Sequence, residues 1–113
     1  MLVFVYGTLK RGRSNHRLMR GARLLGTHVT DPRFTLIDLG GYPGAVEGGE
    51  TAVHGEVYRI STPLLARLDR LEDVPVEYTR QPIASPWGPA WMYLYGGRRR
   101  GRVVPSGMWP RTG

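Results

Sequence analysis

The stretch from Leu2 to Gly12 constrains the fold of this chain more than any other. An apolar run from Leu2 to Tyr6 ends abruptly at Gly7, and a polar, basic turn follows it. A short apolar run that stops at a glycine is typical of a buried strand. Because glycine has no Cβ, the backbone N–H groups of the turn lie open to a ligand. With a helix starting near Ser14 or Asn15, whose N-terminus also favours an anion, the sequence predicts a strand that leads into an anion-binding turn.

One candidate for such a turn is the phosphate-binding P-loop. The spacing of Gly7, Gly12 and Ser14 comes close to that motif, but Arg13 stands where the motif needs lysine. A slim ammonium group reaches the terminal phosphates, whereas the guanidinium group is bulkier and shaped for bidentate contacts. A chain of 113 residues also leaves little room for the several βαβ units of a P-loop domain. We therefore disfavour nucleotide binding.

The rest of the chain predicts more strands than helices. A short helix is expected near Ser14 to Arg20, and an amphipathic helix with a leucine stripe begins at Thr62 as its cap and ends before Pro75. Further strands are expected over residues 24–30, 33–38, 52–60, 78–84 and 90–95, with a glycine-rich loop over residues 40–49. We therefore expect one domain over residues 1–97, built on a mostly antiparallel or mixed sheet. A basic, loosely ordered segment is expected over residues 98–113.

Composition limits the classes of function. The chain has no cysteine, which excludes disulfides, thiol nucleophiles and cysteine metal sites. Its three histidines are scattered without metal-ligand spacing, and the sequence has no Gly-x-Ser-x-Gly motif of a serine hydrolase. No apolar stretch approaches the length of a signal peptide or the ~20 residues of a membrane span. We therefore expect a cytoplasmic protein without a metal site and without a membrane partner.

The net charge of +7 raises the question of a nucleic-acid partner. Basic residues cluster over residues 10–20 and 98–102, and few aromatic residues stand among them. Nucleic-acid modules usually interleave aromatic and basic side chains on one element. We therefore disfavour a nucleic-acid module and interpret the charge as a solvated basic surface, which also attracts a small anionic ligand.

Four motifs occur in an order that resembles the γ-glutamylcyclotransferase-like family. They are Tyr6–Gly12 with Asn15-His16-Arg17, Gly41–Val46, Val53–Tyr58, and Leu68–Glu72 with Tyr78-Thr79-Arg80, and they span residues 2 to about 95. The family includes γ-glutamylamine cyclotransferase and short bacterial proteins of about this length. The resemblance implies a small α+β fold, with a mixed β-barrel or curled sheet flanked by two or more helices.

Among the carboxylates, Glu72 is the first candidate for proton transfer. It lies at the end of the leucine-striped helix and beside its apolar face, where burial and the helix dipole are expected to raise its pKa. Spacing alone fits a solvated glutamate at a fraying helix end better, but the catalytic glutamate of the family falls in a Leu-x-x-Leu-Glu motif that matches Leu68 to Glu72. The residue after it is commonly glycine in the family and is Asp73 here. That second carboxylate is expected to raise the pKa of Glu72 further or to distort the turn.

Three other carboxylates are weaker candidates. Glu77 and Glu56 lie outside the leucine-striped helix, and Asp69 stands three residues before Glu72. We expect Asp69 to face solvent between Arg67 and Arg70.

The resemblance implies an enzyme that converts a γ-glutamyl amine or γ-glutamyl amino acid to 5-oxoproline and a free amine, as a cyclising lyase or acyltransferase without a cofactor. Glu72 is then the general acid and base, and a second group of residues binds the substrate: Tyr6, Gly7, Thr8, Leu9, Tyr78 and Tyr95. Ordinary core packing is an equal alternative for Tyr78 and Tyr95. A non-catalytic small-molecule binding protein on the same fold is the main alternative function.

Overall fold

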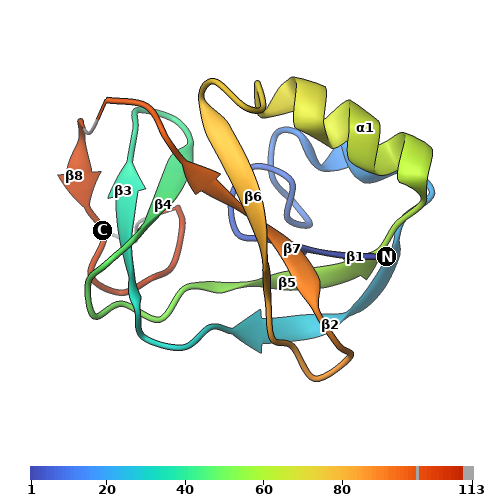
Figure 1. Cartoon of the computed structure of the whole chain (residues 1–113), viewed down its shortest axis with the longest axis horizontal. Coiled ribbons are helices and arrows are strands. Elements are labelled where there is room, and N and C mark those ends of the chain that lie inside the picture. Colours follow the sequence, from blue (N-terminus) through green and yellow to red (C-terminus); the bar gives the residue numbers. More distant parts are fainter. Residues whose placement is uncertain (99, 111–113) are drawn as a thin grey trace.

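The computed structural model describes residues 1–98 and 100–110, which form two sheets, one α-helix and a short 3-10 helix (Figure 1). The larger sheet has the order β2-β5-β1-β7-β6, with β1 (Leu2–Val5), β2 (Arg23–Val29), β5 (His54–Arg59), β6 (Tyr78–Ile83) and β7 (Ala90–Tyr95). The smaller sheet has the order β4-β3-β8, with β3 (Phe34–Asp38), β4 (Pro43–Glu47) and β8 (Arg102–Val103). The helices are η1 (His16–Met19) and α1 (Thr62–Leu71).

Strand β1 occupies the centre of the larger sheet and is buried on both faces. It pairs antiparallel with β5 and parallel with β7. Val3 and Val5 belong to one core cluster, and Phe4 and Tyr6 belong to another, because successive side chains of a strand point to opposite faces. A strand covered on both faces has a continuous apolar sequence, which explains the run that predicted it.

The two core clusters lie on the two sides of β1. The helix-side cluster contains Val3 and Val5 with the buried leucines of α1, Leu64, Leu65 and Leu68. The sheet-side cluster contains Phe4, Val57 and Met92 of the larger sheet and Tyr6 just after β1, with Phe34, Leu36, Ala45 and Val104 of the smaller sheet and its flanks. In Figure 1 the smaller sheet stands at the left of the view and α1 at the upper right.

Helix α1 forms where the leucine stripe predicts it, and local interactions fix both ends. Its N-cap is Ser61, whose side-chain oxygen accepts a hydrogen bond from the Leu64 N–H at 3.3 Å, so Thr62 is the first helical residue instead of the cap. At the other end Glu72 is the C-cap, and its N–H donates to the Leu68 carbonyl at 2.9 Å. The helix therefore fixes the position of Glu72 at its C-terminal end.

Other elements differ from the sequence-based expectation. The segment expected as a glycine-rich loop contains β4, in which Gly44 packs so closely that a Cβ there would lie 2.7 Å from the Tyr95 Cβ. Glycine weakens the strand signal in the sequence, which is why pattern alone missed it. The expected first helix is only the single 3-10 turn η1. The described residues form two separate sheets and no closed barrel, and α1 is their one α-helix.

The described part of the basic C-terminal segment packs on the domain, which differs from the loosely ordered end that the sequence predicts. Strand β8 pairs with β3, and Val104 is buried in the sheet-side cluster. The His54 N–H donates to the Gly107 carbonyl at 2.9 Å. Residues 99 and 111–113 of the predicted segment lie outside the described residues.

Candidate active site

A cavity of about 380 Å³ opens between the end of α1, the turn after β1 and the loop before β4. This is within the range typical of small-molecule sites. Its wall combines the apolar residues of β1 and its neighbours with two carboxylates and several hydroxyl and amide groups: Phe4, Val5, Tyr6, Gly7, Thr8, Leu9, Ser14, Asn15, Gly41, Tyr42, Pro43, Leu71, Glu72, Glu77, Tyr78 and Tyr93. The predicted residues Tyr6, Gly7, Thr8, Leu9, Glu72 and Tyr78 therefore meet in one cavity.

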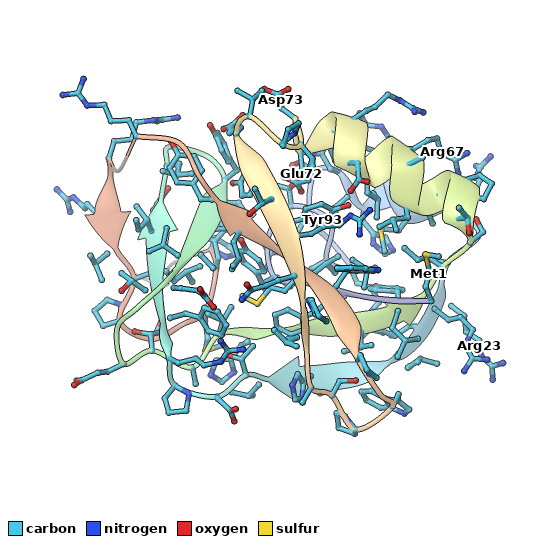
Figure 2. All side chains as sticks on the ribbon, in the orientation of Figure 1. Met1, Arg23, Arg67, Glu72, Asp73 and Tyr93 are labelled. Carbon is cyan, nitrogen blue, oxygen red and sulfur yellow. The ribbon has the colours of Figure 1, made fainter. Side chains whose placement is uncertain are left out.

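Glu72 lines this cavity as a half-buried carboxyl group. Burial raises its pKa to about 7, and the nearby negative charge of Glu77 adds to the increase. In Figure 2 Glu72 lies beneath the end of α1 toward Tyr93, whereas Asp73 lies above it at the edge of the molecule. Glu72 is therefore a carboxyl group that changes its charge near neutral pH.

Asp73 differs from Glu72 in almost every respect. Its side chain is exposed and does not line the cavity, and its backbone has the left-handed conformation, with φ at 51°. Glycine adopts this conformation without strain. The carboxylate that raises the pKa of Glu72 is Glu77, so the expected effect of Asp73 on that pKa is wrong.

The turn after β1 presents unpaired donors to the cavity. Asn15 folds back over it, with its N–H donating to the Thr8 carbonyl at 2.9 Å and its side-chain amide to Thr8 Oγ1 at 3.0 Å. Within the part of the chain that the structure describes, the backbone N–H groups of Thr8 and Leu9 donate to no protein acceptor. Two neighbouring N–H groups without a protein acceptor suit a carboxylate or a developing oxyanion.

Gly7 is required here by a close contact. A Cβ at this position would lie 2.7 Å from Pro43 Cγ, so only glycine lets the turn approach the start of β4. The contact brings two segments that are more than thirty residues apart into one wall of the cavity.

The basic side chains of this turn point elsewhere. Lys10 Nζ donates to the Trp109 carbonyl at 2.6 Å. Arg11 donates to Glu56 through its backbone N–H at 3.0 Å and through Nε at 3.4 Å. Glu56 is buried, does not line the cavity, and also accepts a hydrogen bond from the Tyr58 hydroxyl at 3.0 Å. It therefore holds the turn from the side away from the cavity. Arg13, which stands at the lysine position of the P-loop motif, does not line the cavity either.

The predicted tyrosines have different roles in the structure. The Tyr6 hydroxyl donates to the Tyr93 carbonyl at 2.7 Å and accepts from the Ala45 N–H at 3.0 Å, so it joins the two sheets. The Tyr78 hydroxyl donates to the Pro43 carbonyl at 2.7 Å and supports the loop before β4. Tyr95 does not line the cavity and packs edge-on against Tyr78, with 5.5 Å between ring centroids. Burial raises the pKa of the Tyr6 and Tyr78 hydroxyls, so both stay protonated.

The expectation that Asp69 faces solvent is wrong. Its carboxylate accepts two hydrogen bonds from Arg80, at 2.9 and 3.1 Å, and a third from the Tyr93 hydroxyl at 2.7 Å. The Arg80 guanidinium also lies 4.3 Å from the ring centroid of Trp91. Asp69 thus ties α1, and with it Glu72, to β6 and β7.

Sequence reasoning did not assign Ser14, Asn15 and Tyr93 to the cavity wall, although Asn15 stood in a family motif. For Tyr93 the signal was present, because it shares a strand face with the predicted Tyr95. The described residues contain no group of histidine, aspartate and glutamate side chains that could hold a metal ion. Nor is any helix among them long and apolar enough to cross a membrane.

The fold and the cavity define a small α+β domain with an acidic site, and comparisons with known proteins identify its family. The model of the family described as gamma-glutamyl cyclotransferase, AIG2-like, matches residues 3–111. A protein of Vibrio cholerae, named as a candidate gamma-glutamylcyclotransferase, is 52% identical over 96% of this chain and 94% of its own length. The chain therefore belongs to the gamma-glutamyl cyclotransferase, AIG2-like family.

Solved structures agree with this assignment. The solution structure of protein ytfP from Escherichia coli is 47% identical, covers 97% of this chain and 96% of its own, and superposes with a TM-score of 0.78. The crystal structure of protein PH0828 from Pyrococcus horikoshii is 27% identical, with coverage of 96% and 89% and a TM-score of 0.85. The α+β fold predicted from the resemblance is confirmed.

Proposed function

We propose that this protein cyclises a small anionic γ-glutamyl amine or γ-glutamyl amino acid to 5-oxoproline and releases the amine. The α-amino nitrogen attacks the γ-carbonyl carbon, the ring closes, and the amide C–N bond to the departing amine breaks. The reaction is intramolecular, so correct positioning of the two groups contributes roughly 7–11 kcal/mol to the lowering of the barrier. It needs no cofactor and no metal.

The observation that carries the proposal is a carboxyl group with a pKa of about 7 on the wall of a cavity that also presents two free backbone N–H groups. A general base works best when its pKa lies near the operating pH, and such proton transfer contributes ~10²–10⁴-fold. In this mechanism Glu72 takes, one after the other, the two protons that the α-ammonium nitrogen loses as it becomes the ring N–H, and it passes both to the departing amine, which leaves as an ammonium ion. The N–H groups of Thr8 and Leu9 hold the α-carboxylate or the oxyanion that forms on the γ-carbonyl.

The tyrosines support this arrangement from outside the reaction. Because the Tyr6 and Tyr78 hydroxyls are engaged by backbone groups, we assign them to shaping the cavity. Tyr95 supports Tyr78 from behind. This revises the role of Tyr6, which the family resemblance assigns to substrate binding.

The test is 5-oxoproline release from a panel of γ-glutamyl amines and amino acids by the natural protein and by Glu72→Gln. Turnover should fall by at least a hundredfold in the variant, because the amide keeps the shape of the side chain and cannot accept the proton. Asp73→Asn is the matched control, since it removes one negative charge at the next residue, outside the cavity. Full activity of Glu72→Gln would refute the proposed base.

Binding without turnover has a different meaning. If the folded natural protein binds γ-glutamyl compounds and releases no 5-oxoproline from any of them, the chain is a binding protein on the same fold. That outcome would refute the enzymatic proposal and leave the cavity as a recognition site.

A further inference from the structure

The cavity has the opposite charge to the protein that contains it. The chain carries a net charge of +7, yet the described residues of the cavity wall include Glu72 and Glu77 and no lysine, arginine or histidine. Two basic side chains of the turn, Lys10 and Arg11, donate instead to the Trp109 carbonyl and to the Glu56 carboxylate, neither of which lines the cavity. A ligand therefore meets carboxylates and neutral dipoles in the cavity, whatever the charge of the outer surface.

Glu77 is fixed in this wall more firmly than a surface glutamate. Its N–H donates to the Asp73 carbonyl at 2.9 Å, and its carbonyl accepts from the Gly96 N–H at 2.7 Å. Its side-chain Oε1 accepts a hydrogen bond from the Tyr42 hydroxyl at 2.9 Å. One carboxylate oxygen is thus held by the protein, while Oε2 has no donor among the described residues.

Tyr42 is itself held from the C-terminal segment. Arg100 Nη2 donates to the Tyr42 hydroxyl at 2.9 Å, and Nη1 donates to the Leu39 carbonyl at 2.7 Å. The loop between Leu39 and Tyr42 is closed by a hydrogen bond from the Leu39 N–H to the Tyr42 carbonyl at 2.8 Å. Arg100 and Tyr42 therefore form a chain of contacts that ends on Glu77.

We propose that Glu77 is the specificity residue of this cavity and binds the free α-ammonium group of the substrate, with Tyr42 and Arg100 as positioning residues. The inference rests on the proposed function, because it names the part of the γ-glutamyl substrate that Glu77 recognises.

The division of roles follows from the charges. An ammonium group in this cavity needs an anionic partner, while the α-carboxylate on the same carbon is served by the neutral N–H donors of Thr8 and Leu9. If Glu72 were the sole partner of the ammonium group, the ion pair would lower its pKa and weaken it as a base. A second carboxylate at Glu77 supplies the counter-charge, so that Glu72 is not the sole partner of the ammonium group; in the ligand-free protein the negative charge of Glu77 raises the pKa of Glu72.

The experiment compares two unreactive probes by calorimetric titration in the Glu72→Gln background. One is L-glutamine, and the other is 4-carbamoylbutanoic acid, which is glutamine without its α-amino group. The background is expected to bind L-glutamine at least tenfold more tightly, because a charge-assisted hydrogen bond contributes roughly ten- to hundredfold in affinity. Adding Glu77→Gln should reduce the ratio of the two dissociation constants to about one.

Three further variants sharpen the result. Adding Glu77→Asp keeps the charge and should retain part of the ratio. Adding Tyr42→Phe should lower the ratio by about threefold, because Glu77 keeps its charge and loses one contact. Adding Glu47→Gln, an exposed carboxylate outside the cavity that accepts from Arg33 and Gln81, should leave the ratio unchanged.

Two outcomes overturn the inference. One is a ratio that survives Glu77→Gln in a protein whose circular dichroism and unfolding midpoint show it to be folded. The other is failure of the folded Glu72→Gln background to discriminate between the probes or to bind either. Neither outcome depends on turnover, so the proposed function is tested independently by 5-oxoproline release from the natural protein.

Discussion

The two faces of the larger sheet differ in how closely they are packed and in the side chains that they present. On one face the sheet-side cluster, which includes Phe34, Leu36 and Met92, is buried and almost entirely apolar, although its members Phe4 and Tyr6 also line the cavity. On the other face the helix-side cluster contains four tyrosines and opens into the cavity that holds Glu72 and Glu77. The same strand, β1, contributes alternate residues to both.

The difference shows how a domain of 113 residues separates stability from chemistry. Close packing on the sheet-side face provides the burial of apolar surface that stabilises the fold. The helix-side face gives up part of its packing to a cavity and half-buries a carboxyl group whose ionisation opposes folding. Substitutions on the two faces should therefore have opposite signatures in stability and in activity.

The largest expected effect is on the sheet-side face. Phe34→Ala should lower the free energy of unfolding by about 3–5 kcal/mol, because the side chain is fully buried and its removal leaves a cavity. Leu71→Ala on the cavity wall should cost less than about 1 kcal/mol, since that leucine is 41% exposed. Urea unfolding of both variants measures the contrast. Equal losses would refute the division between the two faces.

The next effect concerns the contacts that hold α1 against the larger sheet on the helix-side face. Asp69→Ala should lower the free energy of unfolding by about 2–3 kcal/mol, because it leaves Arg80 and the Tyr93 hydroxyl without their shared partner. It should also reduce 5-oxoproline release, since α1 then holds Glu72 less firmly. Asp69→Asn, which keeps one acceptor oxygen, should lose less of both. An unchanged melting temperature in Asp69→Ala would show that the contacts of Asp69 contribute little to the stability of the fold.

The sequence predicts a feature of these regions when residues that are adjacent in the chain determine it. Strand β1 and helix α1 are predictable because burial on both faces and a leucine stripe leave marks in adjacent residues. The family motif similarly leads to Glu72, and its raised pKa follows from its place beside the apolar face. These features need no knowledge of distant contacts.

The features that the sequence does not predict all depend on distant contacts. Strand β4 forms because Gly44 fits against Tyr95 and because β3 supplies its partner. Asp69 is held by Arg80 across the helix–sheet interface, eleven residues away, where local pattern indicates only a solvated helix face. The role of Glu77 depends on Tyr42, thirty-five residues earlier.

A smaller effect comes from the ionisation of Glu72. In the folded protein its pKa is raised to about 7 from the ordinary 4.5, so the folded state binds this proton more tightly than the unfolded state. The resulting stability is fully present below about pH 4.5 and is lost as the pH rises through 7. Glu72→Gln stays neutral and should be more stable than the natural protein at pH 8 by roughly 1–3 kcal/mol, with little difference at pH 4.5.

Thermal or urea unfolding across this pH range tests the effect. Asp73→Asn serves as the control, because it removes one negative charge at the next residue, whose side chain is exposed and outside the cavity. A Glu72→Gln variant that is no more stable than the natural protein at pH 8 would mean that ionisation of Glu72 is not opposed in the folded state, and the contrast between the two faces would then lack its electrostatic part.

The smallest expected effect is on the turn after α1, where the backbone conformation of Asp73 should affect stability but not the reaction in the neighbouring cavity. Asp73 has a φ of 51°, which glycine adopts without strain and alanine does not. Asp73→Gly should therefore raise the free energy of unfolding by up to about 0.5–1 kcal/mol, and Asp73→Ala should be less stable than Asp73→Gly by about 1–2 kcal/mol. Both variants should keep 5-oxoproline release and the pKa of Glu72, because the Asp73 side chain does not line the cavity. A loss of release in Asp73→Gly with unchanged stability would instead give this exposed carboxylate a part in the reaction, and the boundary of the site would have to be extended past the end of the helix.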